Sequence, residues 1–363
     1  MKRKKFIFIS LLLIFASLLP NFLWEVKNTE ASWQPNTFLT QEFWDSDWTS
    51  GNLISALFGD GTTGSSAYNR YWEDMDCNLE TMKNRIYYVN VTSWNQLNNL
   101  TWNAIYILSG AFNITLEPES CSAIVGMGDV SISSSSSSNI FNISAKKNVI
   151  IDNIKIKWNG SNNAGIYLIN AHNNTINNVE VWDSKGWLKL QNSSYNTLNK
   201  VRSHDNTWYP AFGILLYNSD NNYIQNSQIF NNTGNYDVWI GLEVNCNYNT
   251  INNVLVYNNN IWIGITAYTI STSSSANFIN NSQIFNNNTW IYFKGEDAKV
   301  NLIYNSNIFN NSEWILTEWN NPIVWTRFVN NGLWINVDSW YSIIYWDDIE
   351  FIHNWLNYTW SLS

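Results

Sequence analysis

The chain has 363 residues, only 13% of them charged, and a formal net charge of −9 at pH 7. This acidic balance provides no broad cationic face, which excludes nucleic acid and anionic membrane surfaces as partners. Neutral polar side chains must then keep the protein soluble, and 62 of the residues are Asn.

The first predicted element is an export signal. Residues 2–5 are basic, and residues 6–19 form an apolar stretch too short to favour spanning a bilayer. We expect a signal peptide over residues 1–31 with cleavage after Ala31; an uncleaved anchor is the alternative. Its removal takes away five cationic and two anionic side chains and brings the net charge from −9 to −12. The prediction is a secreted or cell-surface protein with no membrane span in the mature chain.

The next segment, residues 32–85, has no repeat and is predicted to be an irregular, capping N-terminal region. In an oxidising compartment we expect Cys77 to pair with Cys121 and Cys246 to remain a lone thiol. The sequence has no Cys-x-x-Cys motif and no Cys/His cluster, so we expect no metal and no cofactor.

Residues 86–363 carry a repeat with a period in the twenties, which is typical of a solenoid. Its most regular part reads Asn-x-Ile-x-Asn, followed by an apolar and an aromatic residue and often by Asn-Asn. Apolar and polar residues alternate, as in strands, and Asn or Ser breaks separate the strands. Stacking the copies in parallel places one apolar residue of each copy in an internal column and allows Asn side chains to form ladders. The column is expected to contain Ile176, Ile224, Ile251, Ile279 and Ile303.

The repeat resembles the right-handed parallel β-helix proteins of the pectate-lyase-like superfamily. The stretches 147–156 and 123–126 are similar to the early turns of those proteins. The resemblance implies an all-β fold, a single right-handed parallel β-helix with three short strands in each turn, over residues 86–363. It does not choose among the lyases, glycosidases, epimerases, adhesins and assembly factors that share this fold.

Aligned copies place charged residues in neighbouring outward columns of three consecutive turns. Adjacent turns lie about 4.8 Å apart, so these side chains are predicted to form one patch on one face. The candidate glycan-binding patch consists of Lys155, Lys157, Asp183, Lys185, Arg202, His204 and Asp205. The remaining alternative is a set of ordinary ion pairs on a solvated face.

Several kinds of chemistry fit this patch. Its cations would neutralise a uronate carboxylate, with His204 or Lys157 as the base for the neighbouring C–H proton. Asp183 and Asp205 would instead form a carboxylate pair for glycoside hydrolysis. Residues 202–205, Arg-Ser-His-Asp, loosely resemble the Asp-Pro-His-Asp of alginate epimerases, but the motif sets of polygalacturonases and pectate lyases are missing. Trp158 and Trp182 would stack on sugar rings.

Three functions therefore remain open. The main hypothesis is an exported, cell-surface protein for attachment or glycan recognition, with a polysaccharide or surface glycan as partner. The alternative is a polysaccharide-active enzyme: a uronate lyase, an epimerase or a glycosidase. The third is a purely structural or adhesive rod, which needs only the solenoid and the export signal.

One position of the repeat holds either Gly or Trp. It opens a short strand of the form Gly/Trp-apolar-x-apolar, and its predicted occupants are Gly165, Trp187, Gly213, Gly241, Gly264, Trp290, Trp314, Trp334 and Trp355. The chain has 22 Trp and only 16 Gly. A genetic code that reads UGA as glycine, translated with a table that reads it as tryptophan, would produce this pattern. The competing interpretation is a ladder of exposed Trp rings used for stability or sugar binding.

Overall fold

The structure is a computed structural model. It describes residues 77–352 apart from 79–80, 83, 135, 137, 159–163, 183–187, 207–212, 233–239, 260–262, 267–273, 288–290, 295–297, 299–300, 313–314, 318–320, 322, 333–334 and 338–349. The chain separates into two compact units, residues 1–47 and 48–363, and all described residues belong to the second. The predicted signal peptide, with Ala31, and nearly all of the predicted capping segment lie outside the described residues.

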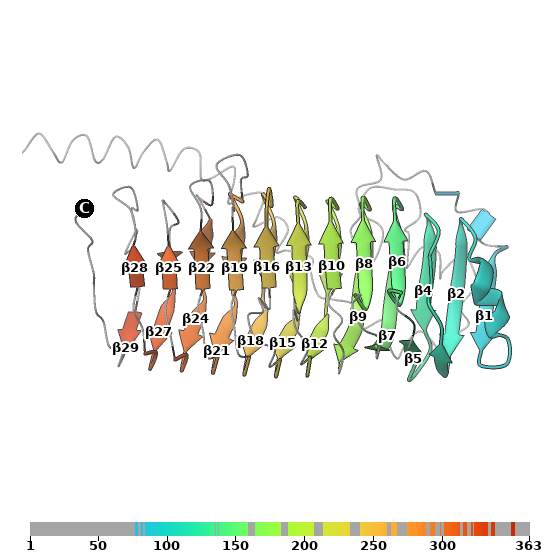
Figure 1. Ribbon diagram of the computed structural model, residues 1–363, viewed down its shortest axis with the longest axis horizontal. Helices are drawn as coiled ribbons and strands as arrows, with labels where there is room; N and C mark the ends of the chain where they lie inside the picture. The colour runs from blue at the N-terminus through green and yellow to red at the C-terminus, as the bar shows by residue number, and fades with distance from the viewer. Residues whose placement is uncertain are drawn as a thin grey trace, which may run out of the picture. The chain divides into compact units, whose positions relative to one another are not determined.

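The described chain coils into parallel strands that return to the same place once per turn. One side of the coil is a nine-stranded sheet, the upper row of arrows in Figure 1. Successive strands pair in register, so that Leu188 lies beside Ile166 of one turn and Ile214 of the next. The strands are β6 (Phe141–Ser144), β8 (Ile166–Ile169), β10 (Leu188–Gln191), β13 (Ile214–Tyr217), β16 (Ile240–Glu243), β19 (Ile263–Thr266), β22 (Ile291–Lys294), β25 (Ile315–Thr317) and β28 (Ile335–Val337).

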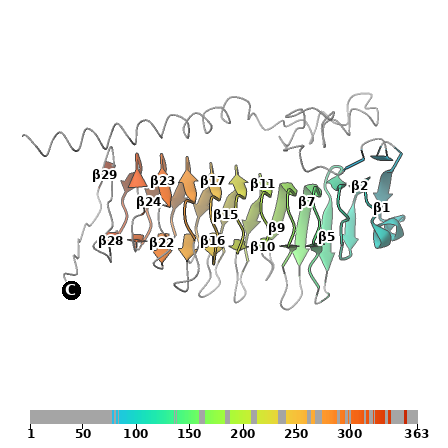
Figure 2. The same ribbon diagram turned by 90° about the horizontal axis from the view of Figure 1, so that it is seen from above.

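The other side is a 20-stranded sheet made of two columns, and Figure 2 shows strands of both sheets from above. Two long strands, β7 (Ile150–Trp158) and β9 (Thr175–Trp182), run through both columns and join them. The first column also contains β1 (Ile86–Asn90), β2 (Ala104–Ser109), β4 (Ser122–Gly126), β11 (Thr197–Asn199), β14 (Tyr223–Gln225), β17 (Thr250–Asn252), β20 (Phe278–Asn280), β23 (Leu302–Tyr304) and β26 (Ile323–Val324). The second contains β3 (Ala111–Asn113), β5 (Ser131–Ser134), β12 (Arg202–His204), β15 (Gln228–Phe230), β18 (Leu255–Tyr257), β21 (Gln283–Phe285), β24 (Asn307–Phe309), β27 (Arg327–Val329) and β29 (Glu350–Ile352). One 3₁₀ helix, η4 (Trp94–Asn99), follows β1.

The expected internal apolar column is present. Ile176, Ile224, Ile251, Ile279 and Ile303 are all buried and follow one another in the strand pairing, with Leu198 between the first two. The fold class predicted from the repeat, an all-β parallel solenoid, is therefore confirmed.

Two ladders of buried Asn residues line the corners of the coil. In each step, the backbone N–H and the side-chain amide of one Asn donate to the Oδ1 atom of the Asn one turn further on. One ladder contains Asn174, Asn196, Asn222, Asn249, Asn277, Asn301 and Asn321. The other contains Asn206, Asn232, Asn259, Asn287, Asn311 and Asn331. These ladders satisfy buried backbone donors at the corners, where the strand pairing is interrupted.

The bend between the two columns uses one left-handed residue per turn. We call this the bend position; it is Asn in most turns because Asn tolerates positive φ better than other residues with a side chain. Its occupants are Asn153, Asn178, Lys200, Asn226, Asn253, Asn281, Asn305 and Trp325.

The cysteines are arranged as expected. A disulfide joins Cys77 to Cys121, just before β4, and so ties the start of the described chain to the coil. Cys246 is free and buried, and burial raises the pKa of its thiol to about 12.

Candidate functional site

The predicted charged columns lie where the repeat placed them. Strand pairing puts Glu180 of β9 between Lys155 of β7 and Arg202 of β12, and it puts Trp182 between Lys157 and His204. In the next four turns, from β15 to β24, neutral residues occupy the same two columns, beginning with Gln228 and Phe230. Charge returns to the first of these columns with Arg327 of β27 and Glu350 of β29. The cations of the predicted patch are thus gathered at the three turns of β7, β9 and β12.

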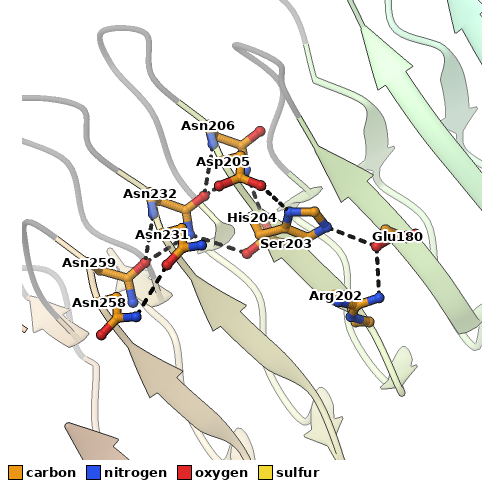
Figure 3. Close-up of polar contacts among 10 residues, drawn as sticks. All are labelled: Glu180, Arg202, Ser203, His204, Asp205, Asn206, Asn231, Asn232, Asn258 and Asn259. Atoms are coloured by element: carbon orange, nitrogen blue, oxygen red, sulfur yellow. Dashed lines mark hydrogen bonds and ion pairs between the residues drawn. The ribbon is translucent and has the colours of Figure 1, made fainter. Parts of the chain in front are cut away.

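Glu180 is the centre of an ion-pair network (Figure 3). Its Oε1 atom accepts from Arg202 Nη1 at 2.8 Å and lies 2.9 Å from His204 Nε2. The other ring nitrogen of His204, Nδ1, lies 2.7 Å from Asp205 Oδ2. We call Glu180, Arg202, His204 and Asp205 the Glu180 cluster.

The cluster holds the ring of His204 from two sides. Its two ring nitrogens contact carboxylate oxygens of different residues, Glu180 on one side and Asp205 on the other. The ring also stacks on Phe230, with centroids 4.6 Å apart, so its orientation is held by packing as well as by charge.

A small cavity of about 190 Å³ lies beside the cluster. The charged residues lining it are Asp129, Lys155, Glu180, Lys200 and Arg202. Lys155 pairs with Asp129 at 2.7 Å, and this hydrogen bond raises the pKa of Lys155. Lys200 occupies a bend position that is Asn in most other turns, and it adds a cation to this wall.

The outcome for the predicted patch is therefore mixed. Lys155, Arg202, His204 and Asp205 converge as expected, and Lys157 lies on the same face, beside Trp182. Asp183 and Lys185 lie outside the described residues, so the hydrolytic pair of Asp183 with Asp205 stays a prediction. Of Trp158, only its place in β7 is described.

Sequence reasoning missed several members of the site. Glu180 shares a column with Lys155 and Arg202, but a repeat alignment does not reveal that one carboxylate joins two neighbouring side chains. Asp129 lies outside the aligned repeats, at the edge of the cavity. Lys200 could have been recognised as the charged residue at an Asn-rich bend position.

A second polar group lies on the nine-stranded sheet. The Tyr167 hydroxyl donates to Gln191 Oε1 at 2.7 Å, and Lys189 Nζ lies 5.3 Å from the centre of the Tyr167 ring. Burial raises the pKa of Tyr167 and lowers that of Lys189. Tyr167 and Lys189 are register partners in β8 and β10, and Gln191 lies at the next outward position of β10.

The described residues contain neither a metal-binding cluster nor a membrane-spanning helix. Across residues 77–352, excluding the gaps given above, no group of three or more His, Cys, Asp and Glu side chains is arranged to hold a metal ion. In the same ranges, no helix is long and apolar enough to cross a bilayer.

Comparison with known proteins agrees with the coil. A family model described as a right-handed beta helix region matches residues 84–241 and, in an overlapping second match, residues 138–308. Among curated proteins, no sequence matches significantly.

Solved structures with a similar coil include polysaccharide-active enzymes. The A-module of a mannuronan C-5 epimerase of Azotobacter vinelandii is 12% identical, with a TM-score of 0.48; the similarity covers 71% of this chain and 89% of that one. An endo-xylogalacturonan hydrolase of Aspergillus tubingensis is 9% identical, with a TM-score of 0.48 and coverages of 74% and 88%. The catalytic domain of a GH87 alpha-1,3-glucanase is 15% identical, with a TM-score of 0.39 and coverages of 76% and 68%.

Proposed function

Since this chain belongs to the right-handed β-helix family, we propose that it is an exported protein that binds an acidic polysaccharide across the Glu180 cluster and the cavity beside it. The family alone does not determine the function, because many activities share this coil. The proposal rests on one observation: cationic side chains converge at three neighbouring turns of a chain that is otherwise poor in charge.

Arg202 has the geometry for a uronate carboxylate. Its guanidinium carries five N–H donors, and the structure assigns one hydrogen bond, from Nη1 to Glu180. The guanidinium also lies 5.5 Å from the centre of the Phe230 ring. Its side chain is 49% exposed, so donors face solvent beside the cavity. Lys200 lines the same cavity. A carboxylate placed there would accept from a planar guanidinium and a flexible ammonium.

The size of the cavity favours an extended ligand. About 190 Å³ is less than the roughly 300–1,000 Å³ of pockets that enclose a drug-sized molecule. It suits one unit of a polymer whose other units lie along the solvent-facing surface. Export, supported by the basic and apolar start of the chain, would bring the protein to such polymers outside the cell.

The aromatic stack next to the cluster is better explained by stability than by sugar binding. Phe230, Tyr257, Phe285 and Phe309 stack on one another with centroids 4.7 to 5.0 Å apart. Each internal ring therefore has both faces covered by its neighbours, whereas a sugar ring packs on a free aromatic face. We expect the charged cluster, and not this stack, to determine ligand binding.

A second candidate function is catalysis at the same place. The observation that favours it is His204, a proton-transfer group held between Glu180 and Asp205. Both ring nitrogens are engaged, so a substrate must displace one carboxylate before His204 can exchange a proton with it. Asp205 is the easier to displace, because its side chain is 52% exposed and that of Glu180 is 19% exposed.

The test compares two arginines of the same outward column. Strand pairing places Arg202 on β12, in the cluster, and Arg327 on β27, several turns away. We expect the purified chain to bind polygalacturonate or alginate more strongly than a neutral glucan, and less strongly as salt is raised. Arg202→Ala should weaken binding about tenfold, the equivalent of about 1.4 kcal/mol. Arg327→Ala should bind like the unmodified chain.

Two results would contradict the proposal: equal losses in both variants, or equal binding of the acidic and neutral polymers. Release of unsaturated uronate, followed by ultraviolet absorbance, separates the two candidate functions. Release that is lost in His204→Gln while binding persists would support catalysis. Binding without release or any other change in the polymer would support recognition alone.

A further inference from the structure

The strand-entry position of the nine-stranded sheet is the residue immediately before each strand. Pairing aligns the first residues of the strands from β8 to β28: Ile166, Leu188, Ile214, Ile240, Ile263, Ile291, Ile315 and Ile335. In strand order the entry position is therefore Gly165, Trp187, Gly213, Trp239, Trp262, Trp290, Trp314 and Trp334.

This register corrects the sequence alignment in two turns. Gly241 and Gly264 are not entry residues; they pair with each other inside β16 and β19. The true entry residues of those strands are Trp239 and Trp262. With the correction, eight consecutive strands have two Gly and six Trp at this position and no other residue type. Trp355 lies outside the described residues.

Where the structure describes this position, the residue is buried. It is Ile140 before β6, the first strand of the sheet, and Gly165 and Gly213 before β8 and β13. The Gly165 carbonyl accepts from the backbone N–H of Phe141, and the Gly213 carbonyl accepts from that of Leu188. In a parallel stack, successive turns offer nearly the same environment at a given position. The smallest and the largest side chains do not ordinarily share such an environment, because interiors are close-packed.

Other Trp residues also behave unlike core aromatics. None of the Trp side chains that the structure describes, at positions 94, 102, 182 and 325, belongs to the buried core, which consists mainly of Ile, Leu, Val and Phe. Trp325 is 51% exposed and has a φ of 48° at a bend position that is otherwise mostly Asn. Glycine reaches positive φ without steric cost, whereas a bulky side chain does not.

An outer ladder of Trp rings is the competing explanation, and the chain shows what such a ladder requires. The stack from Phe230 to Phe309 has a ring in every turn, with no interruption. The entry position, by contrast, has Gly213 between Trp187 and Trp239 in strand order. A residue with no side chain breaks ring-to-ring contact, so the pattern does not fit a continuous ladder.

We infer that the entry-position tryptophans are glycines in the native protein, encoded by UGA codons that the source cell reads as glycine. Some genetic codes read UGA as tryptophan and others read it as glycine. A UGA codon for glycine that is translated as tryptophan would therefore replace glycine by the one residue that alternates with it at the entry position. The composition agrees: Trp, at 22, outnumbers Gly, at 16, although glycine ordinarily makes up about 7% of a chain.

The inference is tested by reading the gene and the native protein. We expect UGA at all six Trp entry positions, and native peptides whose masses correspond to glycine there. A UGG codon at any of the six, or a native peptide with tryptophan at one of them, overturns the inference. Codons and masses are read independently of ligand binding, so this test stands apart from the proposed function.

Folding provides a second readout with a matched control. One recombinant chain carries Trp→Gly at the six entry positions, and a second carries the sequence as written. We expect the first to unfold at a higher urea concentration. Adding Gly213→Trp to this six-glycine chain should lower the urea concentration at which it unfolds. Gly213 is the matched control because this entry residue is glycine whichever way UGA is read. If the chain with six tryptophans is the more stable, the steric part of the argument is wrong.

Discussion

Asn222 offers the sharpest test of what holds the coil together. Its side chain is 1% exposed. Its Oδ1 atom accepts from the backbone N–H of Asn196 at 2.9 Å and from the Asn196 side-chain amide at 3.1 Å. Its own amide donates to Asn249 Oδ1 and to the carbonyls of Ser193 and Asp220, at 3.0 to 3.1 Å.

Asn222→Ala removes all five contacts and leaves buried groups without these partners. The Asn196 N–H loses the acceptor described here, and the Ser193 carbonyl loses a donor. Each buried polar group left unsatisfied costs about 1–3 kcal/mol. Two such groups give a loss of roughly 2–6 kcal/mol, a large part of the ~5–15 kcal/mol that stabilises a typical domain.

Two measurements check this value. Urea unfolding gives the free-energy change, and Asn307→Ala is the control, because Asn307 is an exposed strand residue whose loss should change stability by about 0.5 kcal/mol or less. Long repeats can unfold in steps, so hydrogen exchange of peptides covering Asn196 reports the local effect separately. If both variants lose equally little, and exchange near Asn196 is unchanged, the ladder does not stabilise the coil as argued.

Three further predictions concern the core and the cysteines. Ile251→Ala should cost about 2–5 kcal/mol in urea unfolding, because Ile251 is fully buried in the internal column; a loss below 1 kcal/mol would contradict this packing. Burial raises the pKa of the Cys246 thiol to about 12, so the thiol stays neutral at pH 8.5. Iodoacetamide should therefore label Cys246 only after unfolding. Rapid labelling of the folded chain would show that Cys246 is accessible to solvent. Replacing both Cys77 and Cys121 by Ser should lower stability by about 3 kcal/mol, which is measured as a reduced melting temperature. An unchanged melting temperature would mean that the disulfide does not constrain the unfolded chain.

The fold was largely predictable from sequence because its period appears in every turn. Alternation with period two assigns Ile224 and Ile251 to the inside, and the same alternation places Arg202 outside. Register was less predictable. The two misplaced entry residues, Gly241 and Gly264, differ from the true ones by two positions. A slip of two leaves every side chain on its own face, so alternation cannot detect it; only pairing with neighbouring strands does.

The site was predictable as a location but not as a network. Outward columns follow from the repeat, so the convergence of Lys155 and Arg202 was foreseeable. Which atoms meet depends on side-chain torsions, and these are not encoded by periodicity. Only the three-dimensional structure shows that Glu180 is the shared partner of Arg202 and His204.

The two Asn ladders divide each turn into a fixed arc and a variable arc. Within a turn the ladder residues are always ten positions apart, as in Asn196 and Asn206 or Asn301 and Asn311. From one turn to the next, the separation along the first ladder ranges from 20 to 28 residues. All of this difference in length falls between the second ladder of one turn and the first ladder of the next. Insertions and deletions are thereby confined to one arc, while the arc that carries Arg202 and His204 keeps its geometry. Evolution can lengthen or replace the loops beside the cluster without moving it, so new binding preferences can arise on a frame that stays the same.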